Sequence, residues 1–420
     1  MRNICVLICL IQIIVIDINV FAQSPEDNIQ KYRSSLYKIV VVEKSSGEKS
    51  SQGTGFQVSK DGLIATNYHV VSKFLLEPEK YNLESIDYND LHDNLKVVKF
   101  DVVNDLALVR GKQRNDENYF RINKNPPSHG SKIFAIGNPL SVGMTIVEGN
   151  YNGLEEKSLN ECFNFSGSLN SGMSGGPAIT SNGEVIGVNV ATLGQQVSFL
   201  VPAKFLNNLL LKKTPKLQDG HVFSMIENQL LQFQDDYIKK LMDTKWKLKD
   251  FGPAKVPDKL SSAFQTWGGN NENELHLLYK EHNFKAFVNA QTYVTDKLIT
   301  GKIFYQYYWL ESKGLNEIRF YNLVSEYLGK YIPTDSGDEK QVTAFTNRSD
   351  FVRLGKMTWK VNYCVRNYKK YPSLYDVVIN MASLDKSDNA LIIWLTLSGV
   401  SKNNALLLNR KFLENVKWVK

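Results

Sequence analysis

Cysteine and histidine, on which disulfide scaffolds and most metal sites depend, are scarce in this chain, at four and six of 420 residues. Two of the cysteines lie in an apolar N-terminal run, so only Cys162 and Cys364 remain beyond it. These two residues are in different halves of the chain, and a bridge between them would have to clamp the halves together. We therefore expect free thiols and a core whose stability does not rest on disulfides.

Signatures of metal and nucleotide sites are missing as well. No cluster of cysteine and histidine has the spacing of a zinc site, and no acidic loop has the pattern of a calcium site. No glycine-rich phosphate loop is present either. These absences lead us to expect neither a metal nor a cofactor.

Long hydrophobic runs are confined to the N-terminus, where residues 4–16 are almost entirely apolar. A membrane-spanning helix takes about 20 such residues, and Val20 and Ala22 satisfy the small-residue rule for cleavage after Ala22. We predict a signal peptide over residues 1–22 and an exported protein, periplasmic or secreted, without a stable membrane span after cleavage. An uncleaved N-terminal membrane anchor is the alternative, because two polar residues lengthen the tail of the run.

Tryptophan is absent from the first half of the chain, and charge divides the sequence at the same place. All six tryptophans lie in the second half. Residues 23–210 hold 18 lysines and arginines against 20 acidic residues, whereas residues 211–420 hold 31 against 22, so the net charge of +7 belongs to the second half. We predict one domain over residues 23–211, a polar linker over 212–220 and a second domain over 221–420.

The second half mixes helical and strand patterns, which indicates a small α+β domain of unknown role. Apolar residues at helical spacing predict helices over or within 221–242, 273–290, 315–331 and 403–419. Short β-branched runs predict strands over 357–365, 374–382 and 390–397. The basic residues are spread rather than clustered, so we expect solvated lysines around an aromatic core and no nucleic-acid partner. A substrate-recruiting or regulatory module is the alternative.

The first half has the pattern of an all-β domain. Its apolar runs are short, rich in valine, isoleucine and phenylalanine, and separated by turn residues, for example over 38–43, 55–59, 133–137 and 184–190. Such spacing is typical of a β-barrel or sandwich. One helix is expected over residues 202–211, where four apolar side chains fall on one face.

Ser174 stands in a glycine-framed run, Leu169-Asn170-Ser171-Gly172-Met173-Ser174-Gly175-Gly176-Pro177. A nucleophilic serine needs an exposed tight turn and free backbone N–H groups beside it to hold an oxyanion. Because Gly172 can adopt backbone angles closed to other residues, the N–H groups of Gly172 and Ser174 can point into one hole. Taken alone, the run is also compatible with an ordinary glycine-rich hairpin turn.

Two residues upstream complete a candidate catalytic set. His69 follows a predicted β-hairpin and is expected at a strand end, where its imidazole can take a proton from Ser174 and return it to a leaving amine. Asp105 directly precedes an apolar strand and can accept the other ring N–H of the histidine. Alone, His69 could be a surface or capping residue and Asp105 a turn residue. Together, the order His69, Asp105, Ser174 is a known chain order of a Ser-His-Asp triad.

These motifs resemble those of the trypsin-like serine peptidases, most closely the Deg/HtrA group, over about residues 30–210. Besides the Ser174 run, the matching segments are Gly53-Thr54-Gly55-Phe56, Thr66-Asn67-Tyr68-His69-Val70, Asp105-Leu106-Ala107-Leu108, Ala135-Ile136-Gly137-Asn138-Pro139, Gly183-Glu184-Val185-Ile186-Gly187-Val188-Asn189 and Phe199-Leu200-Val201-Pro202. The resemblance implies two packed six-stranded β-barrels with the cleft between them, one carrying His69 and Asp105 and the other Ser174. It also implies a serine endopeptidase that cleaves polypeptides through an acyl-enzyme. Because family members are often trimers, a homo-oligomer is a further expectation.

The chain departs from the Deg/HtrA pattern in two places. Met173 stands where these enzymes usually carry asparagine, and its side chain is expected to point away from the oxyanion. No carboxylate-binding loop of the PDZ type is recognisable after residue 211, so the resemblance does not extend to regulation by a PDZ domain.

The resemblance also implies a substrate pocket. Its base would be Ser168, and its walls would be formed by Val190, Ala191, Thr192, Val197 and Phe199. With no acid at the base, a lysine or arginine side chain would be left unpaired there. The pocket is therefore expected to accept valine, alanine or leucine.

A non-catalytic function is the alternative for the whole chain. The same residues could belong to a protease-fold sensor or binding protein that uses its cleft as a receptor and whose C-terminal domain recruits a partner. Labelling by a fluorophosphonate probe distinguishes the two functions.

Overall fold

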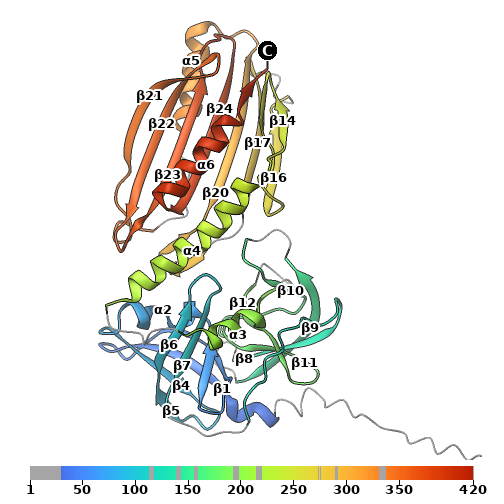
Figure 1. The fold of residues 1–420 in the computed structure, drawn as a ribbon, viewed down its shortest axis with the longest axis vertical. Helices are drawn as coiled ribbons and strands as arrows, with labels where there is room; N and C mark the ends of the chain where they lie inside the picture. Colours follow the sequence, from blue (N-terminus) through green and yellow to red (C-terminus); the bar gives the residue numbers. More distant parts are fainter. Residues whose placement is uncertain are drawn as a thin grey trace, which may run out of the picture.

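A computed structural model describes residues 30–112, 118–138, 143–155, 159–192, 198–213, 220–272, 274, 276–288, 292–330 and 337–419. The chain forms two bodies stacked along its long axis, which we call the N-terminal region (residues 30–213) and the C-terminal region (residues 220–419) (Figure 1). The predicted signal peptide, residues 1–22, lies outside the described residues, as does most of the predicted linker.

The first sheet of the N-terminal region is an open half-barrel of seven antiparallel strands in the order β5-β4-β1-β2-β3-β7-β6. The strands are β1 (Leu36–Glu43), β2 (Lys49–Gln57), β3 (Leu63–Thr66), β4 (Tyr81–Ile86), β5 (His92–Asn94), β6 (Lys96–Asp101) and β7 (Leu106–Arg110). The sheet differs from the closed six-stranded barrel that we expected, because the short strand β5 pairs only with β4 and leaves an edge.

The second sheet is a closed barrel in the order β10-β13-β12-β11-β8-β9, as the resemblance implied. Its strands are β8 (Lys132–Gly137), β9 (Thr145–Leu154), β10 (Phe163–Phe165), β11 (Pro177–Thr180), β12 (Val185–Thr192) and β13 (Ser198–Pro202). Alternate residues of β8 explain the packing: Ile133 and Ala135 lie in the barrel core, while Phe134 and Ile136 pack in the core shared with the first sheet.

Among the described residues, the short helices η1 (Arg33–Ser35), α2 (Tyr68–Leu76) and α3 (Ala203–Leu211) accompany these sheets. The prediction of a helix over 202–211 is confirmed. Leu206 and Leu209 of α3 are buried in the core between the two sheets, so the amphipathic spacing in the sequence reflects one buried face.

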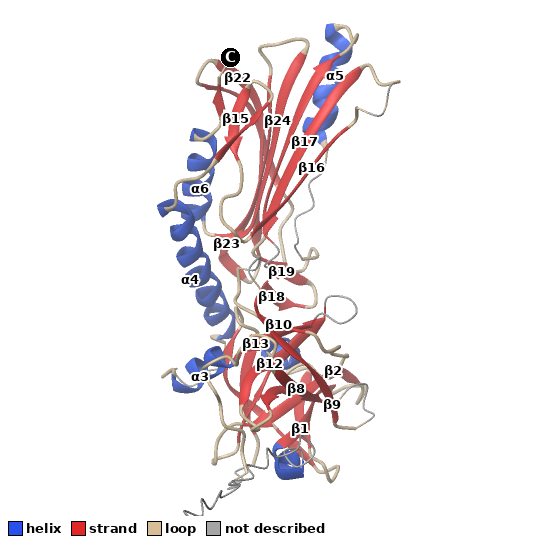
Figure 2. Cartoon of the chain, turned by 90° about the vertical axis from the view of Figure 1, so that its right-hand side faces the viewer, coloured by secondary structure: helices blue, strands red, loops and turns tan. Residues whose placement is uncertain are grey.

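The C-terminal region is built on a second seven-stranded antiparallel sheet, in the order β16-β17-β20-β24-β23-β22-β21. Its strands are β16 (Phe264–Asn270), β17 (Tyr279–Val288), β20 (Ile303–Ser312), β21 (Thr346–Leu354), β22 (Met357–Tyr368), β23 (Tyr371–Ser383) and β24 (Asn389–Val400). Helices α4 (Val222–Asp243) and α6 (Lys402–Glu414) lie along one face, and α5 (Glu317–Gly329) lies on the other (Figure 2). The central strand β24 is almost wholly buried because both of its faces are covered.

Most elements predicted for the C-terminal region are present, including the helices now assigned as α4 and α5 and the strands β22, β23 and β24. The helical prediction within 273–290 is wrong, because β17 occupies most of it. Phe284, Ala286 and Val288 are buried at a period of two, and β17 pairs with strands on both sides. The predicted helix over 403–419 ends early, at Glu414, and β25 (Lys417–Trp418) follows.

Two small sheets complete the C-terminal region. Strands β14 (Leu248–Phe251), β15 (Ala254–Pro257) and β25 form one of them. Strands β18 (Thr292–Thr295) and β19 (Leu298–Thr300) form a two-stranded hairpin that contacts α2 of the N-terminal region. This β18–β19 hairpin is the part of the C-terminal region that bears most directly on the site described below.

One apolar core spans both regions. Its members from the N-terminal region include residues of the first sheet and of α2, and its members from the C-terminal region are Ile226, Leu230, Val294, Leu298, Val342, Tyr368, Tyr371 and Leu374. All of these side chains are buried, so the two regions pack against each other as tightly as elements within a domain do.

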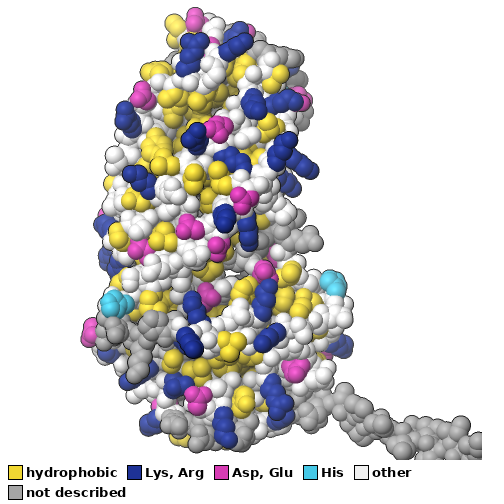
Figure 3. Space-filling model, in the orientation of Figure 1, with side chains coloured by type: hydrophobic (Ala, Val, Ile, Leu, Met, Phe, Trp, Pro, Cys, Tyr) yellow, Lys and Arg dark blue, Asp and Glu magenta, His cyan; other side chains and the backbone are white. Residues whose placement is uncertain are grey.

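The tryptophans serve mainly as core residues. Trp246, Trp309, Trp359 and Trp394 are buried, whereas Trp267 is 47% exposed. On the face drawn in Figure 3, lysine and arginine side chains are scattered among acidic ones rather than gathered in one patch. Cys162 and Cys364 are half-buried and are not joined to each other by a disulfide. Within the described residues, no helix is long and apolar enough to cross a membrane.

Candidate active site

His69 lies in the first turn of α2, not at a strand end as we expected, because β3 stops at Thr66. Asn67 occupies the N-cap position with extended backbone, but its side chain makes no capping hydrogen bond to the helix. Its Nδ2 donates instead to the backbone carbonyl of Asp105, at 2.8 Å. Tyr68 and Val70 are fully buried on either side of His69, whose own side chain is 29% exposed. The helix therefore holds His69 at the rim of the apolar core.

Asp105 ends the turn between β6 and β7 in the left-handed backbone region, with φ 52°. Aspartate tolerates this region better than most residues, and such strained residues gather at functional sites. The turn is also held by Asp101, whose carboxylate accepts the backbone N–H of Asn104 at 2.9 Å and its side-chain amide at 2.7 Å. The Asp105 side chain is thereby directed across to α2.

Both oxygens of the Asp105 carboxylate contact His69. Oδ2 lies 2.7 Å from the ring Nδ1, and Oδ1 accepts the His69 backbone N–H at 2.8 Å. The Asp105 carboxylate therefore caps α2 in place of the Asn67 side chain. It accepts a backbone N–H at the start of the helix and places negative charge at the helix N-terminus.

The pKa of His69 is raised above its ordinary value of 6.5. Burial of the ring is the largest single effect and lowers the pKa, but the charge of Asp105 and its hydrogen bond together outweigh burial. A ring held in this way keeps Nδ1 for the carboxylate and leaves Nε2 free to accept a proton.

Ser174 lies on a tight turn opposite His69. Two backbone hydrogen bonds form the turn, from Met173 to Asn170 at 3.0 Å and from Gly176 to Met173 at 3.1 Å. Thr54 of β2 ties the turn to the first sheet, because its N–H donates to the Ser174 carbonyl at 2.8 Å and its Oγ1 to the Gly172 carbonyl at 2.7 Å. The site is therefore assembled from both sheets of the N-terminal region.

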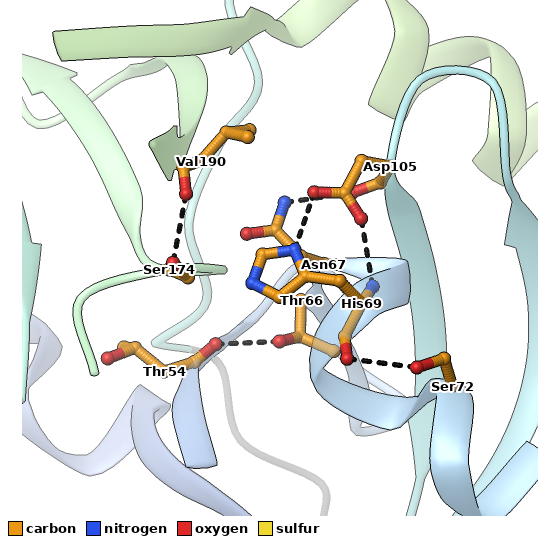
Figure 4. A network of polar contacts seen from close by, with 8 residues as sticks. All are labelled: Thr54, Thr66, Asn67, His69, Ser72, Asp105, Ser174 and Val190. Carbon is orange, nitrogen blue, oxygen red and sulfur yellow. Dashed lines mark hydrogen bonds and ion pairs between the residues drawn. The ribbon is translucent and has the colours of Figure 1, made fainter. Parts of the chain in front are cut away.

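The Ser174 hydroxyl donates to the backbone carbonyl of Val190, at 3.0 Å. Figure 4 shows the His69 ring between Asp105 and the Ser174 turn, with the hydroxyl directed toward Val190. A rotation about the Ser174 Cα–Cβ bond is needed to redirect the hydroxyl to the imidazole. In this arrangement the serine hydroxyl proton is held by a backbone acceptor and not by the imidazole.

Gly172 and Ser174 carry the two N–H groups predicted to hold an oxyanion. Gly172 has φ 95°, a conformation that favours glycine. Neither N–H donates to any described residue of the protein. Both donors are thus available to a ligand.

Close packing explains the other glycines of the motif. A Cβ on Gly53 would lie 2.8 Å from the Ser174 carbonyl oxygen, and one on Gly137 would lie 2.6 Å from the Met173 Cα. Gly175 and Gly176 abut the carbonyl oxygens of Thr54 and Ile136 in the same way. The Met173 side chain is fully buried in the core of the closed barrel.

The structure describes the side chains of only some of the predicted substrate-pocket residues. Ser168 is exposed, and Val190 and Phe199 are half-buried on neighbouring strands of the closed barrel. The side chains of Ala191 and Thr192, and all of Val197, lie outside the described residues. The pocket itself stays a prediction.

Sequence reasoning missed one aromatic neighbour of the site. The ring of Tyr293, from the β18–β19 hairpin, lies edge-to-face on His69 with centroids 5.9 Å apart and an interplanar angle of 73°. No pattern near Tyr293 points to such a contact, because the two residues are distant in the chain. Within the described residues, no group of three or more potential metal ligands is found.

Comparisons with known proteins identify relatives of the N-terminal region. Residues 53–188 match the model of the trypsin-like peptidase domain. This part of the chain is a trypsin-like peptidase domain.

Relatives of the domain carry Deg and HtrA names. The chloroplastic protease Do-like 5 of Arabidopsis thaliana is 31% identical over 191 residues, which cover 39% of this chain and 57% of that protein. A probable periplasmic serine endoprotease, DegP-like, of Chlamydia pneumoniae is 30% identical over 194 residues, covering 43% of this chain and 37% of that protein. The crystal structure of Deg5 is 29% identical, with a TM-score of 0.39, and covers 45% of this chain and 95% of that one. The chain thus spans 57% of the first relative and 37% of the second, which is less than two thirds of either protein.

Proposed function

We propose that this protein is an exported serine endopeptidase whose catalytic residues are His69, Asp105 and Ser174. The observation that carries the proposal is the two-point contact of the Asp105 carboxylate with His69, on the side of the ring opposite the Ser174 turn. The match of residues 53–188 to the trypsin-like peptidase domain supports it. The division into residues 23–211, a linker over 212–220 and residues 221–420 stays part of the proposal.

The chemistry follows from the roles of the three side chains. Nε2 of His69 takes the Ser174 proton as Oγ bonds to the scissile carbonyl carbon, and the carbonyl oxygen becomes an oxyanion. His69 then gives this proton to the leaving amine as the C–N bond breaks, which leaves an acyl-enzyme. A water molecule then attacks the acyl carbon while His69 takes its proton. The bond to Ser174 Oγ breaks, His69 returns the proton to the serine, and the carboxylic acid product is released. Asp105 holds the Nδ1 side of the ring and stabilises the imidazolium.

The oxyanion would be held by the backbone N–H groups of Gly172 and Ser174. Preorganised donors of this kind stabilise charge that develops only in the transition state, and losing one costs about a hundredfold to a thousandfold in rate. The free state of both donors among the described residues supports this role.

We further propose that cleavage occurs after small apolar residues, since Ser168 would leave a basic side chain unpaired at the pocket base. Residues 1–22 would direct export and would be removed in the process. Mass spectrometry of the protein recovered from the exported fraction tests this removal. An N-terminus at Gln23 is the expected result; a retained apolar segment would indicate a membrane anchor.

Reaction with a fluorophosphonate probe tests the central proposal. The wild-type chain should be labelled and should hydrolyse an unfolded protein, and Ser174→Ala should do neither. Ser171→Ala is the matched control, because it removes a hydroxyl from the same turn while leaving the proposed triad intact.

Absence of labelling in the wild type, with the fold intact, would instead favour the non-catalytic alternative, a protease-fold sensor or binding protein. The hydrogen bond of the Ser174 hydroxyl to Val190 is the observation that keeps this alternative in view. Labelling should also be measured in the presence of unfolded polypeptide as an activator, because substrate binding would redirect the hydroxyl.

A further inference from the structure

The β18–β19 hairpin belongs to the C-terminal region but packs against the helix that carries His69. Val294 and Leu298 of the hairpin are fully buried, in the same core as Tyr68, Val70 and Val71 of α2. The hairpin is therefore packed into the core of the N-terminal region and does not merely touch its surface.

A buried hydrogen bond fixes the register of this contact. The Tyr68 hydroxyl donates to the backbone carbonyl of Val294 at 3.0 Å, and the Tyr68 side chain is fully buried. Tyr68 immediately precedes His69, so the bond anchors the first turn of α2 to the hairpin. Breaking a buried bond of this kind leaves a carbonyl without a donor, which costs about 1–3 kcal/mol.

Tyr293 stands over the His69 ring itself. Its ring meets the imidazole in a T-shaped arrangement at 5.9 Å, a geometry in which aromatic rings attract each other. It also meets Tyr68 edge-on, at 6.5 Å. Burial raises the pKa of the Tyr293 phenol, the nearby Ser72 side chain partly offsets this effect, and the charges of Asp296 and Asp105 raise the pKa further. The phenol thus stays neutral, and its ring packs against the His69 imidazole.

The hairpin is in turn held by a buried polar network of the C-terminal sheet. The hydroxyls of Thr300 and Tyr368 are 3.1 Å apart, and Tyr368 donates to Asp376 Oδ1 at 2.7 Å. Arg366 pairs with the other oxygen of Asp376 at 2.8 Å, and Asp376 is fully buried. The hydrogen bonds of such a buried network are all satisfied in one arrangement of its side chains, so the network fixes the position of the hairpin relative to the sheet.

Helix α4 makes a second connection, to the segment that precedes Asp105. Gln229 donates to the Phe100 carbonyl at 3.1 Å and accepts the Val102 N–H at 2.8 Å. Five residues further along, Gln234 donates to the Gly399 carbonyl of the C-terminal sheet at 2.9 Å. The C-terminal region thus contacts the elements that carry both His69 and Asp105.

We propose that Tyr293 is a positioning residue for His69, so that the C-terminal region forms part of the catalytic centre. The inference rests on the proposed triad. The ring of Tyr293 restricts rotation of the imidazole, and the Tyr68–Val294 bond restricts the helix turn beneath it. If the imidazole is free to rotate, its Nε2 moves away from the Ser174 hydroxyl. Misplacements of about 1 Å cost about a hundredfold in rate.

The test compares Tyr293→Ala and Tyr293→Phe in the full chain. Tyr293→Ala should lower kcat by about tenfold to a hundredfold, with KM changed by less than about twofold. Tyr293→Phe should restore kcat to near the wild-type value, because the ring rather than the hydroxyl makes the contact. Phe351→Ala, which removes a 65% exposed aromatic ring from the C-terminal region, is the control and should leave kcat unchanged.

A second measurement does not depend on turnover. In a Ser174→Ala background with ¹⁵N-labelled histidine, the Nδ1 proton of His69 should give a protected, downfield signal, and Tyr293→Ala should broaden it through exchange. Unchanged kcat and an unchanged His69 signal in Tyr293→Ala would overturn the inference. If instead the wild type shows no turnover while the His69 signal still responds to Tyr293→Ala, the proposed function fails and the positioning contact stands.

Discussion

Asp105 caps the helix whose second residue is His69, and it does so with the carboxylate that also binds the His69 ring. The backbone N–H of His69 donates to Oδ1 at 2.8 Å, and the ring Nδ1 lies 2.7 Å from Oδ2. One side chain therefore fixes both the start of α2 and the orientation of the imidazole. This coupling explains why Asp105 is held in a left-handed backbone conformation that directs its side chain to the helix.

Replacing Asp105 by asparagine should lower kcat/KM by about a thousandfold to ten-thousandfold. The amide keeps the size of the side chain but loses the charge that stabilises the imidazolium, and its N–H₂ group competes for the wrong tautomer of His69. Peptide hydrolysis measures the loss. Asp101→Asn is the control, since Asp101 holds the same turn without touching His69. An equal loss in the two variants would mean that the turn, and not the charge of Asp105, matters.

The pH dependence of activity should follow the raised pKa of His69. Because the neutral imidazole is the base, kcat/KM should rise with pH through an apparent pKa above 6.5 and then level off. In Asp105→Asn, this acidic limb should move to lower pH. An acidic limb at or below 6.5 in the wild type would contradict the assignment.

The same shift has a consequence for stability, with a definite sign. The folded protein binds the His69 proton more tightly than the unfolded chain, so the pair contributes stability that is fully present below about pH 6.5 and declines as pH rises through the folded pKa. Denaturant unfolding across this range, compared between the wild type and His69→Gln, measures the contribution. The difference between the two proteins should shrink toward higher pH.

Gly172→Ala should abolish most activity, whereas Gly47→Ala should not. Both glycines have positive φ, 95° and 71°, so alanine strains the backbone at either position by about 1–2 kcal/mol. Relief of the strain at residue 172 would move an N–H proposed to hold the oxyanion, with a loss of about a hundredfold to a thousandfold in kcat. A Cβ on Gly47 meets nothing within 4 Å, which makes it the matched control for strain alone. Similar activity in the two variants would argue against the oxyanion role.

Tyr68→Phe should destabilise the protein by about 1–3 kcal/mol, because the buried carbonyl of Val294 loses its donor. Tyr37→Phe removes another buried hydroxyl from the same core, one that donates to the Gln57 side chain at 3.1 Å. Urea unfolding should show a loss in both variants. Only Tyr68→Phe should also lower kcat, since Tyr68, unlike Tyr37, donates a hydrogen bond to the hairpin that bears Tyr293.

Reporter peptides test the proposed substrate preference. Peptides ending in valine or alanine before the scissile bond should be cleaved faster than matched arginine peptides, because a guanidinium at the pocket base would lose its hydration without gaining a partner. Faster cleavage of the arginine peptides would contradict the pocket assignment. Ser168→Asp should shift the preference toward basic residues if Ser168 forms the base.

The sequence predicted much of the N-terminal region, but not the open edge of its first sheet or the helix that carries His69. Short apolar runs separated by turn residues indicated an all-β domain, and the resemblance to the trypsin-like peptidases implied two packed barrels, of which one is a closed barrel and the other an open sheet. His69 was misplaced at a strand end because its helix starts without a capping side chain from Asn67. The cap comes from Asp105, which lies 36 positions further along the chain, and no local pattern reports it.

In the C-terminal region, long-range pairing overrode local spacing. Apolar residues at helical spacing within 273–290 suggested a helix, but β17 gains hydrogen bonds from β16 and β20 along its length and buries Phe284, Ala286 and Val288 on one side. The contact of Tyr293 with His69 depends on how the two regions dock, and docking leaves no periodic trace in a single sequence.

The order of synthesis gives the β18–β19 hairpin a further meaning. A growing chain completes His69, Asp105 and Ser174 well before residue 293 is made. If the histidine is held in place only once Tyr293 docks, a partly synthesised or C-terminally clipped chain carries all three reactive side chains yet cleaves slowly. Full proteolytic activity would then begin only after the C-terminal region has been synthesised and has folded against the N-terminal region.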